Sequence, residues 1–255
     1  MVLPLPISSI SRLLLKLIRN ILQCDSAFHY NGASYIIHSL FNVEVSAVTL
    51  SVQQLQCSRG DLCLFQDLSL ELQAGQLIWL EGRNGSGKTT LLRTLCGLFL
   101  ADEGEVLWRG ESIKKATDIF YRELFYLGHQ NALKLDLNPI ENLQVLSRLI
   151  GQSISEEEIE QALSKMGLAG YEDVPVRQMS QGQKRRVALS RLLINDAPLW
   201  ILDEPFVALD VAAVELLQSI IVQHVQDGGM VILTTHQAVP LPEEQMQRLS
   251  LDRYV

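Results

Sequence analysis

One segment of the sequence has the residue types and the spacing of a phosphate cradle. Residues 82–89 read Gly-Arg-Asn-Gly-Ser-Gly-Lys-Thr, which satisfies the pattern GxxxxGKS/T. Glycines let the backbone curl so that successive N–H groups point at phosphate oxygens, and a helix that begins there adds the positive end of its dipole. Lys88 would neutralise the β- and γ-phosphates, and the Thr89 hydroxyl would bind Mg²⁺. We therefore expect a nucleoside triphosphate to contact Gly82, Arg83, Asn84, Gly85, Ser86, Gly87, Lys88, Thr89 and Thr90.

A pair of adjacent carboxylates follows a later apolar segment. Residues 199–205 read Leu-Trp-Ile-Leu-Asp-Glu-Pro. Asp203 suits Mg²⁺, directly or through water, and Glu204 is then placed to polarise or orient the attacking water as a general base. GTPase chemistry would also need an Asn/Thr-Lys-x-Asp guanine reader, and the nearest match, residues 133–136, begins with leucine. The pair indicates nucleotide hydrolysis without guanine specificity.

A second candidate anion site precedes the carboxylates. Ser180 and Gln183 have the spacing of a capping box, and Gly182 lies between them. A serine hydroxyl, a glycine backbone and a helix N-terminus together bind anions. Such a combination most often serves simple capping, but its position between the phosphate cradle and the carboxylates favours a function.

The elements that must position these residues alternate between strand and helix. Residues 68–72 alternate apolar and polar like a half-buried strand. Three short apolar runs are typical of strands buried on both faces: residues 77–80, 199–202 and 230–234. Helical patterns cover residues 90–95, 187–194 and 211–226. The last helix would begin at Asp210 as a cap and end at Gly228-Gly229. This alternation predicts an α/β fold with a parallel sheet.

Composition restricts the class of protein. The 255 residues include 21 Lys+Arg and 29 Asp+Glu, a net charge of −8, and 47% are hydrophobic. This is the composition of a globular chain and excludes intrinsic disorder, while the acidic balance argues against general nucleic-acid binding. The four cysteines form no CxxC pair, which argues against a disulfide framework or structural zinc. No apolar run approaches the roughly 18 residues of a membrane span.

The first 45 residues differ from the rest of the chain in their pattern of apolar and charged residues. Apolar residues from Ile10 to Leu22 recur at helical spacing, with Arg12, Lys16 and Arg19 on the other side. Such a stretch could lie on an anionic membrane surface. A disordered tail or an over-long translation start are the alternatives, and we favour these because the motifs begin only later.

The order of the motifs resembles that of the ATP-binding subunits of ABC transporters. Their LSGGQ signature stands just before the Walker B strand, as residues 179–183 do here. Gln130 matches the Q-loop, residues 208–210 match the D-loop, and His236 matches the H-loop. The resemblance runs from about residue 48 to the end of the chain.

The resemblance implies an architecture. It is a P-loop NTPase fold of the α/β class, a RecA-like core with a mostly parallel sheet, together with an antiparallel β subdomain and a helical subdomain. The ATP-binding domain would cover residues 46–255, after an N-terminal extension of residues 1–45. The helical subdomain would cover about residues 131–179 and dock on a membrane-spanning subunit.

The resemblance also implies roles for single residues. The family forms head-to-tail dimers in which ATP on one Walker A loop is sealed by the signature segment of the other copy. Glu204, His236 and Gln130 would form the catalytic set, and Thr89, Gln130 and Asp203 the magnesium set. Gln130 would also couple to the membrane partner. The remaining nucleotide contacts implied are Ser180, Gly182, Gln183 and Asp210, of which Asp210 links the two sites.

Three departures from the family pattern affect these expectations. Met179 replaces the signature leucine with a side chain of similar volume. Gln181 replaces the first signature glycine, so the backbone there cannot depend on a positive φ. Residues 55–61 contain no aromatic side chain to stack on adenine, and Phe65 is the nearest candidate. We therefore expect weak recognition of the base.

Longer strings resemble one group within the family, the cytochrome c maturation ATPases, also called haem exporter ATP-binding proteins. They are residues 104–108, 126–130, 174–192, 199–210 and 231–237, and they include Phe206 and Gln237 among the distinguishing residues. This resemblance implies a membrane-spanning partner of the CcmB type and a peripheral location on the cytoplasmic face of the inner membrane. It leaves open whether haem is exported or released from a chaperone.

Two alternatives remain. A soluble ABC-type switch would act on DNA or ribosomes without transport, but such proteins usually carry two cassettes, a coiled-coil insertion or basic surfaces. This chain has one cassette and a net negative charge. An inactive nucleotide-binding scaffold is opposed by the intact Lys88, Glu204 and His236.

Overall fold

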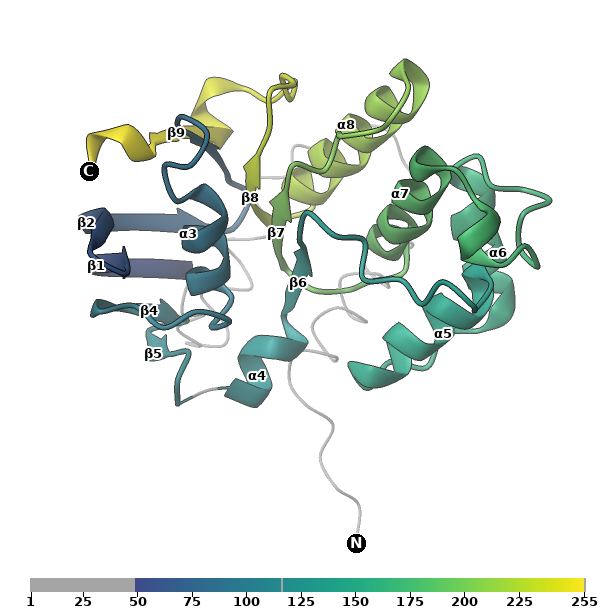
Figure 1. Cartoon of the computed structure of the whole chain (residues 1–255), viewed down its shortest axis with the longest axis horizontal. Helices are drawn as coiled ribbons and strands as arrows, with labels where there is room; N and C mark the ends of the chain where they lie inside the picture. The colour runs from purple at the N-terminus through teal and green to yellow at the C-terminus, as the bar shows by residue number, and fades with distance from the viewer. Residues whose placement is uncertain (1–48, 116, 255) are drawn as a thin grey trace, which may run out of the picture. The chain divides into compact units, whose positions relative to one another are not determined.

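The computed structural model describes residues 49–115 and 117–254 (Figure 1). The expectation of a basic amphipathic helix between Ile10 and Leu22 falls outside the described residues. None of the helices in the described part of the chain is long and apolar enough to cross a bilayer.

Two sheets form the frame of the domain. The first is antiparallel and has the strand order β2-β1-β4-β5. Its strands are β1 (Thr49–Arg59), β2 (Leu62–Gln73), β4 (Glu103–Trp108) and β5 (Glu111–Ser112). The second sheet is parallel and has the order β6-β7-β8-β3-β9. Its strands are β6 (Leu124–Leu127), β7 (Leu199–Asp203), β8 (Met230–Thr234), β3 (Leu77–Glu81) and β9 (Met246–Ser250).

The sequence patterns identify four of these strands correctly, namely β2, β3, β7 and β8. The three apolar runs become β3, β7 and β8, which lie side by side in the parallel sheet. Residues 68–72 alternate because they lie in β2, where Leu68, Leu70 and Leu72 are buried and the residues between them are exposed. This strand belongs to the antiparallel sheet and pairs with β1.

Six helices and four short 3₁₀ turns connect the strands of the described residues. The helices are α3 (Lys88–Leu95), α4 (Thr117–Arg122), α5 (Pro139–Leu149), α6 (Glu156–Lys165), α7 (Gln181–Ser190) and α8 (Val211–Gln226). The turns are η1 (Val176–Gln178), η2 (Arg191–Leu193), η3 (Glu243–Gln245) and η4 (Leu251–Arg253). Helices α5 and α6 fall within residues 131–179, for which a helical subdomain was expected.

Both helix starts follow the predicted caps, whereas the apolar pattern of one helix does not cover its whole length. Asp210 caps α8, because its Oδ1 accepts a hydrogen bond from the Ala213 N–H at 2.9 Å, and Gly228 follows the helix with a φ of 89°. The helix expected over residues 187–194 instead begins at Gln181 and gives way to a 3₁₀ turn at Arg191. The capping box at Ser180 sets this earlier start.

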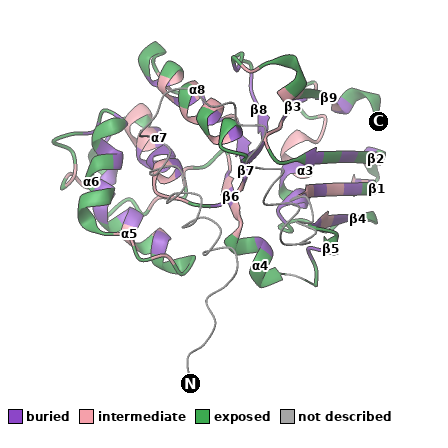
Figure 2. Cartoon of the chain, turned by 180° about the vertical axis from the view of Figure 1, so that it is seen from behind, coloured by how far each residue is buried: buried purple, intermediate pink, exposed green. Residues whose placement is uncertain are grey.

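The parallel sheet separates two hydrophobic cores. Alternate residues of a strand point to opposite faces of its sheet. Leu199 and Ile201 of β7 pack in a core with α3 and the antiparallel sheet, whereas Trp200 and Leu202 pack in a core with α5 to α8. Every residue of β7 and β8 is buried, as Figure 2 shows in purple. Burial on both faces explains the continuous apolar runs, and the predicted fold class is confirmed.

Candidate nucleotide-hydrolysis site

The predicted phosphate cradle connects β3 to α3. Gly87 caps α3 with a φ of 99°, in the left-handed region, and a Cβ there would lie 3.1 Å from the Cβ of Leu64. At Gly82, whose φ is 151°, a Cβ would lie 2.7 Å from the Ser86 hydroxyl oxygen. The tight curl of the loop therefore requires glycine at both positions.

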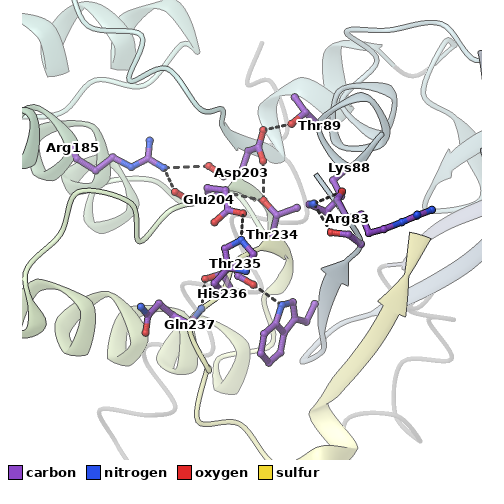
Figure 3. Close-up of polar contacts among 12 residues, drawn as sticks. Arg83, Lys88, Thr89, Arg185, Asp203, Glu204, Thr234, Thr235, His236 and Gln237 are labelled. Carbon is purple, nitrogen blue, oxygen red and sulfur yellow. Dashed lines mark hydrogen bonds and ion pairs between the residues drawn. The ribbon is translucent and has the colours of Figure 1, made fainter. Parts of the chain in front are cut away.

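The start of α3 has the properties of an anion site. No side chain caps this helix, and its first turn contains no acidic residue, so its N–H groups and the positive end of its dipole can act on a phosphate. The Lys88 ammonium donates to the carbonyl oxygens of Gly82 at 2.7 Å and Arg83 at 3.0 Å (Figure 3). An ammonium has three donors, so one remains for a phosphate oxygen. The Ser86 hydroxyl is buried and has no hydrogen-bond partner among the described residues.

Arg83 lies at the outer side of this loop. Its side chain is 80% exposed, and its Nε lies 3.4 Å from the Asp252 carboxylate in η4. An exposed ion pair of this length contributes little to stability. The guanidinium can therefore change partners, and its contact with phosphate stays a prediction.

A chain of hydrogen bonds joins the cradle to the carboxylate pair. The Thr89 hydroxyl donates to Asp203 Oδ2 at 2.9 Å, and the Thr234 hydroxyl donates to Asp203 Oδ1 at 2.8 Å. The Glu204 N–H donates in turn to the Thr234 hydroxyl at 2.9 Å. Asp203 is only 3% exposed, and these bonds give each oxygen of the buried carboxylate a hydrogen-bond partner. These three bonds connect α3, β7 and β8 at one edge of the parallel sheet (Figure 3).

Thr89 and Asp203 fit a magnesium ion. A hydroxyl and a carboxylate oxygen 2.9 Å apart are the oxygen ligands that Mg²⁺ prefers. Magnesium in nucleotide sites is held by one or two carboxylates together with substrate phosphates and water, without an all-protein cage. The described residues contain no group of three or more His, Cys, Asp and Glu side chains that could hold a metal alone.

Glu204 and His236 lie next to each other at the exposed side of this edge. The His236 Nε2 is 3.8 Å from Glu204 Oε1, and the two side chains are 81% and 24% exposed. Glu204 has a φ of 47°, a left-handed conformation that is unusual for a residue other than glycine. Trp79 holds the segment before His236, because its indole N–H donates to the Thr235 carbonyl oxygen at 3.0 Å. The structure thus brings Lys88, Thr89, Asp203, Glu204 and His236 together.

A further residue, Arg185 of α7, contacts the site and was not identified from the sequence. It is 4% exposed. Its guanidinium donates to the carbonyl oxygens of Asp203 at 3.2 Å, Glu204 at 2.7 Å and Pro205 at 3.2 Å. It also donates to the Gly128 carbonyl oxygen and the Asn131 side chain. The signal that could have identified it is a cation in helical register with the buried Ala188, Leu189 and Leu192.

Gln130 lies in the loop after β6. Its side chain is exposed, and its neighbours Gly128 and Asn131 are the two residues of this loop that Arg185 binds. The loop is therefore fixed on both sides of an accessible glutamine. The expected contact of Gln130 with metal or water stays a prediction.

The signature segment begins α7 as the spacing predicted. The Ser180 hydroxyl accepts from the Gln183 N–H at 3.2 Å, and the Gln183 side chain accepts from the Ser180 N–H at 2.8 Å. Gln181 is the first residue of the helix and is not among the residues with positive φ, as the replacement of glycine required. A Cβ on Gly182 would lie 2.9 Å from the Ala208 carbonyl oxygen, so this glycine allows α7 to approach the D-loop.

The signature segment and the phosphate cradle of one chain are held apart. Helix α3 packs in the core on one face of the parallel sheet, and α7 packs in the core on the other face (Figure 1). Asp210, besides capping α8, accepts a hydrogen bond from the Arg186 guanidinium of α7. Ser180, Gly182, Gln183 and Asp210 thus form a second group of predicted site residues, separate from the group around Asp203.

The candidate residue for stacking on adenine is wrong, whereas weak recognition of the base stays a prediction. Phe65 was the nearest aromatic candidate for stacking on adenine, but it is 0% exposed. Its ring lies inside the core beneath the cradle, 3.5 Å from the position of a Cβ on Gly87. A side chain enclosed in this way presents no face to a base.

The comparisons with known proteins agree with this geometry. A family model described as ABC transporter matches residues 65–207. A protein of Dechloromonas aromatica named "Cytochrome c biogenesis ATP-binding export protein CcmA" is 51% identical over 202 residues, which cover 79% of this chain and 99% of that protein. A protein of the same name from Methylococcus capsulatus is 48% identical, and the match covers 76% of this chain and 94% of that protein. A third protein of this name, from Vibrio parahaemolyticus, is 45% identical, and the match covers 79% of this chain and 98% of that protein.

Solved structures share the fold. A putative ABC transporter ATP-binding protein from Pyrococcus furiosus superposes with a TM-score of 0.69 at 25% identity, over 81% of this chain and 98% of that one. An ATP-binding cassette described as dimeric, in a post-hydrolysis state bound to ADP and Pi, gives a TM-score of 0.65 at 23% identity, over 74% and 88%. Together with the site geometry, these matches show that the chain belongs to the ABC transporter ATP-binding family and, within it, to the CcmA proteins.

Proposed function

We propose that this chain hydrolyses MgATP as the energy-coupling subunit of an ABC complex in cytochrome c biogenesis, in a head-to-tail dimer with a second copy of itself. The observation that carries the proposal is the chain of hydrogen bonds from Thr89 through Asp203 and Thr234 to the Glu204 backbone. It connects the residues that would hold the phosphates to the residue that would act on water.

The described residues can perform each part of the reaction. The N–H groups at the start of α3 and the Lys88 ammonium bind the β- and γ-phosphates and stabilise the charge that develops on them. A magnesium ion held by Thr89 and Asp203 would neutralise further negative charge on these phosphates. Glu204 orients a water molecule for in-line attack and accepts its proton. His236, exposed beside Glu204, is placed to contact the γ-phosphate.

The position of the signature segment supports a dimeric site. Ser180 is exposed at the start of α7, whose first turn contains no acidic residue. Because α7 packs on the face of the sheet opposite α3, this second anion-binding terminus serves the site of another copy. In this arrangement Ser180, Gly182 and Gln183 seal the nucleotide bound to the partner's cradle.

The helical subdomain proposed for residues 131–179 supplies a surface for a membrane-spanning subunit of the CcmB type. Leu135, Val145 and Leu149 are 54%, 40% and 76% exposed on or next to α5. Val145 and Leu149 are one turn apart on the same face of α5, and exposed apolar side chains on one face mark an interaction surface. The chain would then be a peripheral protein on the cytoplasmic face of the inner membrane, and Gln130 would couple the docked subunit to the site. The complex either exports haem or drives its release from a chaperone.

The substitution Glu204→Gln tests the proposal. It removes the general base and keeps the cradle, so kcat should fall by about 10²–10⁴-fold, while MgATP still binds and the closed dimer accumulates. Glu215→Gln on the exposed face of α8 is the matched control and should behave like the wild type. Steady-state phosphate release and light scattering with MgATP measure both effects. Unchanged turnover in Glu204→Gln contradicts the assignment.

A further inference from the structure

We infer that Arg185 is a positioning residue that joins the signature helix to the Glu204 peptide and to the Q-loop of the same chain. The segment that one copy contributes to its partner's nucleotide then moves together with its own general base. The inference rests on the proposed hydrolysis by Glu204 and names a residue on which that hydrolysis depends.

The hydrogen bonds of Arg185 use its whole guanidinium. A guanidinium has five N–H donors in a fixed plane. The Nε–H donates to Pro205, the NH1 group to Gly128 and Asn131, and the NH2 group to Asp203 and Glu204. The distances run from 2.7 to 3.3 Å. No other side chain has both the number and the spacing of donors for this set of acceptors.

The cost of burying this cation indicates that the contacts matter. Burial lowers the pKa of the Arg185 guanidinium, while the carboxylates of Asp203 and Glu204 act in the opposite direction. A charged side chain that is 4% exposed destabilises the fold unless its donors are satisfied. Four of the five bonds end on backbone carbonyl oxygens, so what they mainly fix is the path of the backbone.

The backbone that Arg185 holds includes the strained peptide of the general base. Glu204 has a φ of 47°, and such a conformation persists only when its surroundings hold it. Thr234 accepts from its N–H and Arg185 donates to its carbonyl oxygen. Removing the Arg185 bond releases one of these two restraints, and the Glu204 carboxylate can then turn away from the attacking water.

Kinetics of the full-length chain test this role. Arg185→Gln should lower kcat at saturating MgATP by tenfold or more and leave the Kd for MgATP within twofold, since the cradle on the other face of the sheet is unchanged. Arg185→Lys should not restore kcat, because one ammonium has three donors for five acceptors. Hydrogen exchange should become faster in peptides that cover residues 128–132 and 203–210.

A second arginine in the same segment is the matched control. Arg191 follows α7 and lies over the Phe125 ring, 4.8 Å from its centroid. Arg191→Gln should lower the melting temperature and leave kcat and the exchange of both peptides unchanged. An effect of general instability would lower kcat equally in the two variants.

Three results would overturn the inference: an unchanged kcat in Arg185→Gln, a loss of kcat that Arg191→Gln reproduces, or full recovery in Arg185→Lys. A wild-type chain that hydrolyses no ATP would instead contradict the proposed function. In that case the exchange rates still decide whether Arg185 holds the two segments, because they are measured without turnover. Unchanged exchange in Arg185→Gln would then overturn the inference.

Discussion

Thr234→Val removes one oxygen from the centre of the site and keeps the shape of the side chain. Thr234 is 0% exposed and ends β8. Its hydroxyl donates to Asp203 Oδ1 at 2.8 Å and accepts from the Glu204 N–H at 2.9 Å. Valine fills the same volume, so the substitution breaks both bonds without opening a cavity.

The loss of unfolding free energy follows from the two groups that lose a hydrogen-bond partner, the Asp203 carboxylate and the Glu204 N–H. A hydrogen bond to a charged carboxylate contributes about 1.5–3 kcal/mol, and a buried N–H left without an acceptor costs about 1–3 kcal/mol. The sum is about 2.5–6 kcal/mol of unfolding free energy. For a domain of this size each kcal/mol lowers Tm by about 2–4 °C, so the melting temperature should fall by roughly 5–24 °C.

The same substitution should lower catalysis. If the lost Glu204 restraint appears in the transition state, its 1–3 kcal/mol corresponds to a fall in kcat of about 5- to 150-fold. The Kd for MgATP should change little, because Lys88 and the start of α3 are intact. Phosphate release measured well below the Tm of the variant, together with thermal melting, separates the two effects.

Thr94→Val is the control for burial of a threonine hydroxyl. Thr94 is 3% exposed, and its hydroxyl donates to the Thr90 carbonyl oxygen at 2.9 Å within α3. The control should lose stability and keep kcat. A Thr234→Val variant whose kcat stays within twofold of the wild type would refute the view that this hydroxyl positions Glu204.

Two more substitutions test single contacts. Gly182→Ala places a Cβ 2.9 Å from the Ala208 carbonyl oxygen, so α7 must shift. ATPase activity should fall, while MgATP binding to the isolated chain persists. Normal turnover would argue against a tight contact between α7 and the D-loop. Phe65→Leu should cost about 1–3 kcal/mol in unfolding free energy, because the ring is enclosed in the core. Its ratio of ATP to GTP affinity should equal that of the wild type, and a changed ratio would restore Phe65 as a base contact.

The parts of the site that the sequence predicted are those with local signals. The cradle, the carboxylate pair and the capping box at Ser180 each occupy a few consecutive residues. Their positions relative to strands follow from short apolar runs, which the structure confirms as β3, β7 and β8. The capping box at Ser180 indicated the start of α7, whereas the apolar pattern alone indicated only residues 187–194, because the early turns carry Lys184, Arg185 and Arg186.

The contacts that depend on tertiary structure have no local signal in the sequence, and only the family resemblance placed Thr89 and Asp203 at one magnesium ion. Thr89 and Asp203 are 114 residues apart in the sequence, and the Thr234 and Asp203 pair is 31 residues apart. Only the order of strands in the parallel sheet brings them together. Phe65 was misjudged for a different reason: a register shift in the pairing of β1 with β2 breaks the alternation, so that Leu64 and Phe65 are both buried.

Two consecutive arginines connect α7 to other elements of the site. Arg186 binds the Asp210 carboxylate at the start of α8, and Arg185 binds Gly128 and Asn131 of the Q-loop. A partner that displaces the Q-loop must either carry α7 with it or break these two bonds to a buried cation. At about 1.5–3 kcal/mol each, breaking them would cost about 3–6 kcal/mol. Coupling between sites is typically about 1–3 kcal/mol, so joint movement of the Q-loop and the signature helix is the cheaper response.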